Sequence, residues 1–69
     1  MKVRDARGNI LNIGDEVERI EGEYRNMYKG DRGTITSIRE DGIHVDIKEF
    51  PRGGHGVKHL ARVREENEI

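Results

Sequence analysis

The chain has 69 residues, of which 39% are charged and 32% hydrophobic, and its 13 basic and 14 acidic residues leave a formal net charge of −1. This length predicts one domain with a small core, and the balanced charge argues against bulk non-specific binding to nucleic acid but not against a local basic patch. The lack of cysteine excludes disulfides and cysteine-type zinc sites. Because no apolar run has the length of a membrane span and no secretory leader is recognisable, we expect a cytoplasmic protein that does not enter a membrane.

Residues 1–11 are predicted to form a loose hairpin or hook that packs across the rest of the fold. A short strand candidate, Lys2–Arg4, and the apolar pair Ile10–Leu11 flank Gly8 and Asn9, two residue types that suit a turn requiring positive φ.

The next strand is expected over Glu16–Glu21, with Val17 and Ile20 as its core residues. Side chains of a regular strand alternate between two faces, so positions three apart face opposite sides. We therefore predict a bend at Arg19 that turns both apolar side chains inward, as the closing of a small barrel requires.

The segment from Gly22 to Gly30 is predicted to be a loop. It contains both tyrosines of the chain together with arginine, lysine and methionine. Aromatic rings stack on bases and cations meet phosphates, and the same residue types anchor protein interfaces. This loop is therefore the first candidate contact surface, although one tyrosine could instead cap the open end of a barrel.

The stretch Lys29–Ile47 predicts a β-hairpin. Its first strand is rich in isoleucine and threonine, and Glu40–Gly42 contains the Asp-Gly pair that is typical of a hairpin turn. The three-residue spacing of Ile35 and Ile38 predicts a second bend. Three alternating side chains of the second strand are expected to face the core: Ile43, Val45 and Ile47.

The remaining residues predict a flexible loop over Lys48–Gly56, because this segment contains the only proline and a Gly-Gly-His-Gly run. A spaced apolar set, Val57, Leu60 and Val63, ends the fold with a helical turn or short strand between its members. We expect a very low helix content. Five short strands and tight turns in this length predict an all-β fold, a small antiparallel barrel of about five strands.

Two glycine-marked segments, Ile13–Gly22 and Lys29–Ile35, together with the closing apolar set in 57–63, resemble the KOW-type SH3-like barrel. That module occurs in transcription elongation factors and ribosomal proteins, and the resemblance covers about residues 11–64. Residues 3–15 also show a weaker resemblance to the barrel half of PhnA-type proteins. We therefore expect one SH3-like barrel over residues 1–64 with an N-terminal hairpin or hook, and the charged residues 65–69 predict a frayed tail.

Residues and resemblance together predict a non-catalytic binding module that contacts RNA or DNA, or a protein of a nucleoprotein complex. The candidate contact residues are Tyr24, Arg25, Tyr28, Lys29, Arg32 and Arg52. A protein-binding adaptor or inhibitor that uses the Gly22–Gly30 loop or a strand edge is the alternative, as is a subunit of a larger assembly. The basic residues could also be an ordinary solvated surface, since acidic residues are interspersed among them.

We predict no metal, no cofactor and no catalytic site. The spacing of the three histidines, at positions 44, 55 and 59, matches no metal-binding motif. The only serine, Ser37, is expected in the middle of a strand, and a chain this small has little room to bury a substrate.

Overall fold

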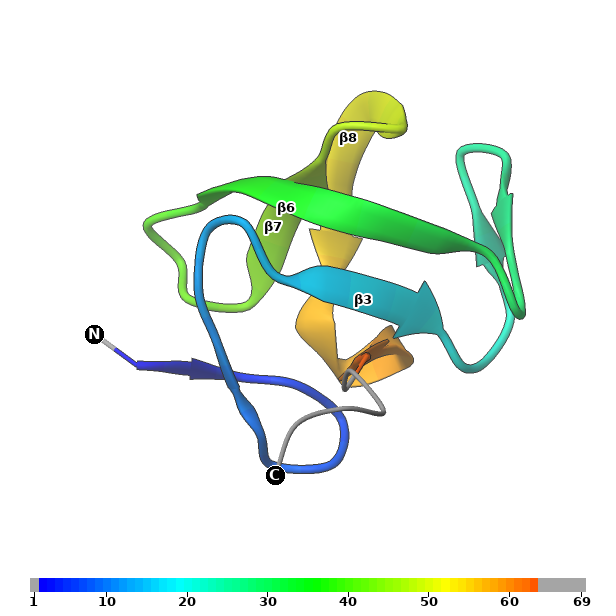
Figure 1. Ribbon diagram of the computed structural model, residues 1–69. Coiled ribbons are helices and arrows are strands. Elements are labelled where there is room, and N and C mark those ends of the chain that lie inside the picture. Colours follow the sequence, from blue (N-terminus) through cyan, green and yellow to red (C-terminus); the bar gives the residue numbers. More distant parts are fainter. Residues whose placement is uncertain (1, 64–69) are drawn as a thin grey trace.

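In the computed structural model, which describes residues 2–63, the central feature is a five-stranded antiparallel sheet. Its strands lie in the order β8-β7-β6-β3-β9 (Figure 1). Strand β9, the last of the five in the sequence, pairs with β3, the first of them. This confirms the predicted all-β, antiparallel fold of about five strands. The strands are β3 (Glu16–Arg19), β6 (Arg32–Ile38), β7 (His44–Ile47), β8 (Phe50–Gly56) and β9 (Leu60–Arg62).

Two small hairpins flank this sheet. One pairs β1 (Val3–Arg4) with β2 (Ile10–Leu11), where the sequence predicts a hairpin or hook. The other pairs β4 (Glu23–Tyr24) with β5 (Met27–Tyr28). A single 3₁₀ turn, η1 (Val57–His59), joins β8 to β9. Residues 64–69, which include the predicted tail, lie outside the described residues.

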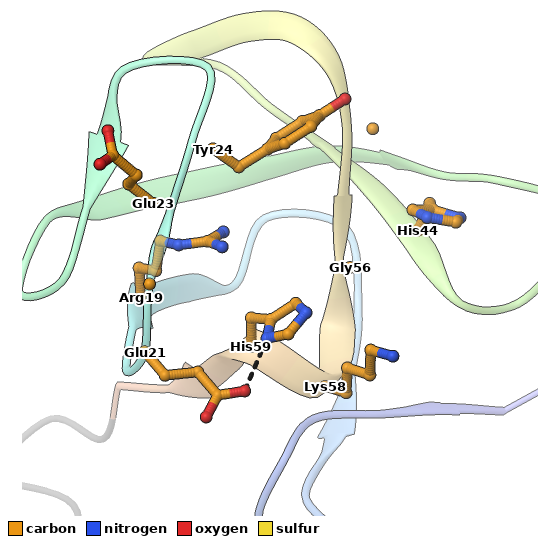
Figure 2. A pocket seen from close by; sticks show the side chains of 10 residues that line it. Arg19, Glu21, Glu23, Tyr24, His44, Gly56, Lys58 and His59 are labelled. Atoms are coloured by element: carbon orange, nitrogen blue, oxygen red, sulfur yellow. Dashed lines mark hydrogen bonds and ion pairs between the residues drawn. The ribbon is translucent and has the colours of Figure 1, made fainter.

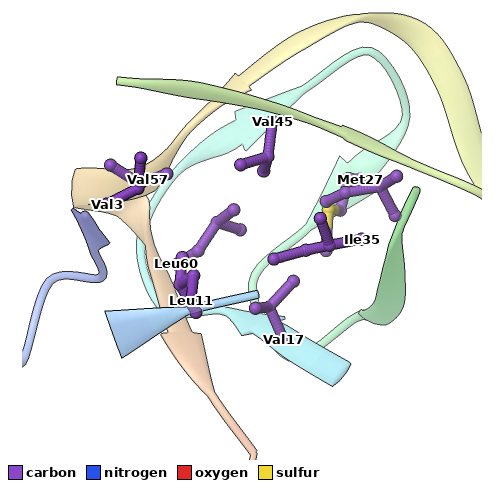
Figure 3. Close-up of a cluster of buried hydrophobic side chains, with 9 residues drawn as sticks. Val3, Leu11, Val17, Met27, Ile35, Val45, Val57 and Leu60 are labelled. Atoms are coloured by element: carbon purple, nitrogen blue, oxygen red, sulfur yellow. The ribbon is translucent and has the colours of Figure 1, made fainter. Parts of the chain in front are cut away.

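The core is a single cluster of branched and unbranched apolar side chains drawn from the sheet and from both hairpins (Figure 3). Figure 3 shows Val3 and Met27, one from each hairpin, on opposite sides of this cluster. The hairpins therefore complete the core, because a sheet this small leaves apolar surface uncovered. The cluster consists of Val3, Leu11, Val17, Met27, Ile35, Val45, Ile47, Val57 and Leu60.

The predicted bend at Arg19 is wrong. Strand β3 alternates regularly and pairs in unbroken register with both neighbours, which places Val17 and Arg19 on the same inner face. Ile20 is only partly buried. An arginine therefore occupies a position that strand geometry reserves for a core residue. The second predicted bend is confirmed, since the pairing of β6 with β7 shifts register between Ile35 and Ser37.

The expected burial of Ile43 is also wrong, because its side chain is 57% exposed. The Asp41 carboxylate accepts hydrogen bonds from the backbone N–H groups of Ile43 and His44. This turn holds Ile43 outside the strand, which begins only at His44. Val45 and Ile47 are buried as expected.

The segment Lys48–Gly56 is not a flexible loop but contains the seven-residue strand β8. Backbone pairing with β7 needs no apolar side chains, and it accommodates the glycines with a shift of register between Val45 and Ile47. Because β8 ends the sheet order, Pro51 can lie on an edge strand without removing a ladder hydrogen bond.

The predicted Gly22–Gly30 loop contains the β4–β5 hairpin. Arg25 and Asn26 form its two-residue turn, and both have positive φ, 49° and 70°. This combination is the geometry that matches the twist of a tight hairpin. The hairpin directs Met27 into the core, where it is fully buried.

Candidate functional site

An open groove of about 600 Å³ lies between the β4–β5 hairpin, the end of β3, strand β8 and η1 (Figure 2). A surface of this size can hold a nucleotide-sized group. Its lining residues are Arg19, Glu21, Gly22, Glu23, Tyr24, His44, Gly54, Gly56, Lys58 and His59.

Tyr24 forms the upper wall of the groove in Figure 2. Its ring is packed edge-on against the buried His55, with 5.3 Å between the ring centroids, and the side chain stays 37% exposed. The guanidinium carbon of Arg25 lies 5.6 Å from the centre of the tyrosine ring, which is within range of a cation–π contact. A Cβ at Gly53 would lie 2.6 Å from the Tyr24 hydroxyl, so the ring can rest against β8 only because this residue is glycine.

The side chain of Arg19 points into the groove beneath Tyr24 (Figure 2). The residue is 4% exposed. Its Nε and Nη1 atoms are buried and have no hydrogen-bond partner within residues 2–63. The groove therefore contains a guanidinium of which two nitrogen atoms make no hydrogen bond within residues 2–63.

Both histidines that line the groove are hydrogen-bonded to a carboxylate. The His59 ring and the Glu21 carboxylate are joined by a hydrogen bond of 2.7 Å, drawn in Figure 2. The His44 ring lies 2.6 Å from the carboxylate of Asp41. Hydrogen bonds from the Ile43 backbone and from the His44 ring hold the pKa of Asp41 below its usual value.

Three of the six predicted contact residues gather at one end of the molecule. Tyr24 lies beside Arg25, and Arg25 lines a second depression of about 300 Å³ together with Arg52. The carboxylate of Glu49 also lines this depression, but it accepts a hydrogen bond from the Thr34 backbone. That bond is the main reason why the pKa of Glu49 is lowered.

The other three predicted residues lie elsewhere. Tyr28 is cross-strand partner to Glu23, not to Tyr24, so the two tyrosines face opposite sides of the hairpin. Tyr28 is 52% exposed, and Lys29 is exposed in the turn that follows it. Arg32 forms an ion pair with Glu18 at 3.0 Å.

The sequence interpretation missed Arg19 as a site residue. The signal that could have identified it is its place two residues after Val17, since both positions share a face in a regular strand. Of the three histidines, His44 and His59 line the same groove and His55 is buried beside Tyr24. Among residues 2–63, no three histidine and acidic side chains are close enough to hold a metal ion.

No helix within residues 2–63 has the length and apolar character needed to cross a membrane. No curated protein and no solved structure matches the chain. Residues 3–68 match the family model described as "Domain of unknown function (DUF7205)". Because this match covers nearly the whole sequence, the protein belongs to the DUF7205 family.

Proposed function

We propose that this protein is a non-catalytic binding module that contacts nucleic acid, free or within a nucleoprotein complex, through the surface formed by Tyr24, Arg25 and Arg52. The observation that carries the proposal is a half-exposed tyrosine ring flanked by arginines on two adjacent depressions. Bases stack on aromatic faces, and guanidinium groups meet phosphates. The resemblance to the KOW-type barrel supports a partner of the transcription or translation type in the cytoplasm.

The charge of this surface supports the same proposal. Neither Arg25 nor Arg52 forms an ion pair within the part of the chain that the structure describes, whereas Arg39 is bound by Asp46 at 2.8 Å. Hydrogen bonds from Arg39 and Ser37 hold the pKa of Asp46 below its usual value.

Ser37 donates its hydroxyl proton to the same carboxylate, so the only serine is already engaged in the sheet.

The test is titration of labelled single-stranded and duplex RNA and DNA at low and high salt. We expect binding that weakens as salt rises, because each bound phosphate releases counterions. Tyr24→Ala should weaken binding by about 5- to 100-fold, the effect of losing one stacked base. Tyr28→Ala is the matched control, because Tyr28 lies on the opposite face of the same hairpin.

A second pair of variants separates phosphate contact from general charge. Arg52→Ala should reduce both the affinity and the salt dependence, whereas Arg32→Ala removes a guanidinium that Glu18 already binds. The proposal fails if the wild-type protein shows no salt-sensitive binding at low ionic strength.

A protein-binding adaptor or a subunit of a larger assembly is the second candidate. The exposed Ile43 favours it, since this side chain and Val57 line a depression of about 390 Å³. Size-exclusion chromatography over a range of concentrations would show self-association, which Ile43→Ser should abolish if this surface mediates it.

A further inference from the structure

The guanidinium of Arg19 is unusual because the residue is only 4% exposed and yet forms no ion pair within residues 2–63. A buried ion without hydrogen bonds costs several kcal/mol, and proteins normally pair such groups. Nε and Nη1 have no partner within residues 2–63. The fold therefore leaves the binding capacity of this side chain unused.

The nearby carboxylates do not use that capacity. Glu21 is hydrogen-bonded to His59 instead of Arg19. Glu23 also lines the groove but makes no hydrogen bond to Nε or Nη1 of Arg19, and as the cross-strand partner of Tyr28 it belongs to the hairpin face opposite Tyr24.

Besides the carboxylates of Glu21 and Glu23, the groove has features that suit an anion. Lys58 and His59 approach from η1, and Gly56 adds no side chain to the β8 wall (Figure 2). Gly54, which also lines the groove, adds none either. The positive charge of a guanidinium is delocalised over the planar group, so an anion at the Nη2 edge, which lies near Gly22 in the groove, is attracted by the whole charge. The space of about 600 Å³ exceeds a single small ion and leaves room for a group that contacts Tyr24.

We propose that Arg19 is the centre of a phosphate-binding pocket, and that Tyr24 contacts the nucleoside part of the same ligand. This inference rests on the proposed function for the source of the phosphate, which is the backbone of a bound nucleic acid. A small phosphorylated molecule would offer the same chemistry to the pocket. The pocket differs from the surface of Arg25 and Arg52, which lies over the neighbouring depression.

The first experiment measures inorganic phosphate binding at constant ionic strength, with chloride as the balancing ion. NMR follows the Nε–H signal of Arg19, and thermal unfolding follows stability. At phosphate tenfold above its Kd, the Tm of the wild-type protein should rise by about 5 °C or more. Arg19→Met should lose this rise, while Arg32→Met, which changes an exposed and already paired arginine, should keep it.

The second experiment repeats the oligonucleotide titration with Arg19→Met and with Arg19→Lys. Loss of affinity in the methionine variant, with partial recovery in the lysine variant, supports a phosphate contact. An unchanged Tm in phosphate, or equal responses of wild-type protein and Arg19→Met, would overturn the inference. An equal rise in Tm with acetate would also overturn it, since the pocket would then bind any anion and not phosphate in particular.

The two proposals fail in different ways. If oligonucleotides bind with normal affinity to Arg19→Met but poorly to Arg52→Ala, the phosphate pocket is wrong and the proposed function stands. If phosphate protects the wild-type protein through Arg19 but no oligonucleotide binds, the pocket stands and its ligand is a small phosphorylated molecule.

Discussion

Two buried charged side chains, Asp5 and Arg19, differ in how many hydrogen bonds the fold gives them. Their exposed fractions are similar, 7% and 4%. The carboxylate of Asp5 accepts hydrogen bonds from the backbone N–H groups of Arg7, Asn9 and Arg62, and one from the Asn9 side chain. The Nε and Nη1 atoms of Arg19 have no such partner in residues 2–63.

Asp5 therefore stabilises the fold, whereas Arg19 is buried without a comparable stabilising contact. Asp5 joins the β1–β2 hairpin to β9 through its bond to the Arg62 backbone, which crosses 57 positions of sequence. Its desolvation is offset by the four donors. Arg19 bears the same kind of cost without that compensation, as expected of a group that is reserved for a ligand.

The largest effect is expected for Asp5→Ala. This variant leaves several donors without an acceptor, so we expect a loss of about 3 kcal/mol of unfolding free energy. Urea denaturation measures it. Asp31→Ala is the matched control, because the Asp31 carboxylate accepts one bond from the Tyr28 backbone at an exposed turn. Equal losses in the two variants would show that Asp5 has no special role.

Acid should remove the stabilisation that the Asp5 carboxylate gives to the fold. Burial by itself raises the pKa of Asp5, but hydrogen bonds from Arg62, Asn9 and Arg7 outweigh it and leave that pKa below its usual value. A carboxyl with a lowered pKa stabilises the fold above its unfolded pKa of about 3.9. That stabilisation is lost as the pH falls through the folded pKa.

Urea denaturation from pH 7 to pH 2 tests this expectation. Asp41, Asp46 and Glu49 also have lowered pKa values, so the wild-type protein should lose stability steadily below about pH 5. Asp5→Asn should show a shallower loss. Arg19→Met removes no carboxyl, and its profile should run parallel to that of the wild-type protein. A parallel profile for Asp5→Asn would contradict the pKa assignment.

Arg19→Met should have the opposite sign to Asp5→Ala. Methionine keeps an unbranched apolar stem and removes the unpaired charge, so we expect a gain of about 1–2 kcal/mol in unfolding free energy. Chemical denaturation without phosphate measures it. A loss of stability would show that Arg19 already has a structural partner, and the contrast with Asp5 would disappear.

Most of the β6–β7 hairpin was predictable because local signals agree there. Its Asp-Gly turn, its branched residues and its alternation all favour the observed strands. Strand β8 was not predictable, because its proline and glycines favour a loop and only pairing with β7 makes it a strand. Ile43 was assigned to the core from alternation alone, whereas the hydrogen bonds of Asp41 keep Ile43 in the turn, so the strand begins one residue later, at His44.

The candidate site was predictable only in part. Tyr24 and Arg25 stand out because aromatic residues are rare in this chain and both tyrosines lie beside basic residues in one short segment. The separation of Tyr28 from Tyr24 depends on the two-residue turn of the hairpin, which fixes the cross-strand partners. A bend was predicted at Arg19 because Val17 and Ile20, taken as the core residues, do not share a face of a regular strand.

The smallest expected effect on stability comes from replacing one of two glycines, Gly8 near Asp5 or Gly53 beside Tyr24, which lines the groove that contains Arg19. Gly8 follows Asp5 and Gly53 supports Tyr24, and both have positive φ, 85° and 68°. Alanine should cost about 1 kcal/mol at either position because of its Cβ. At Gly8 the Cβ meets open space, whereas at Gly53 it meets the Tyr24 hydroxyl at 2.6 Å.

Gly53→Ala should therefore displace the Tyr24 ring and weaken binding in the groove, while Gly8→Ala affects stability alone. NMR contacts between the rings of Tyr24 and His55 report the displacement, and phosphate titration reports the binding. If both variants bind phosphate as well as the wild-type protein, Tyr24 does not shape the pocket. Because the two substitutions share one backbone penalty, any difference between them arises from the tyrosine wall of the groove.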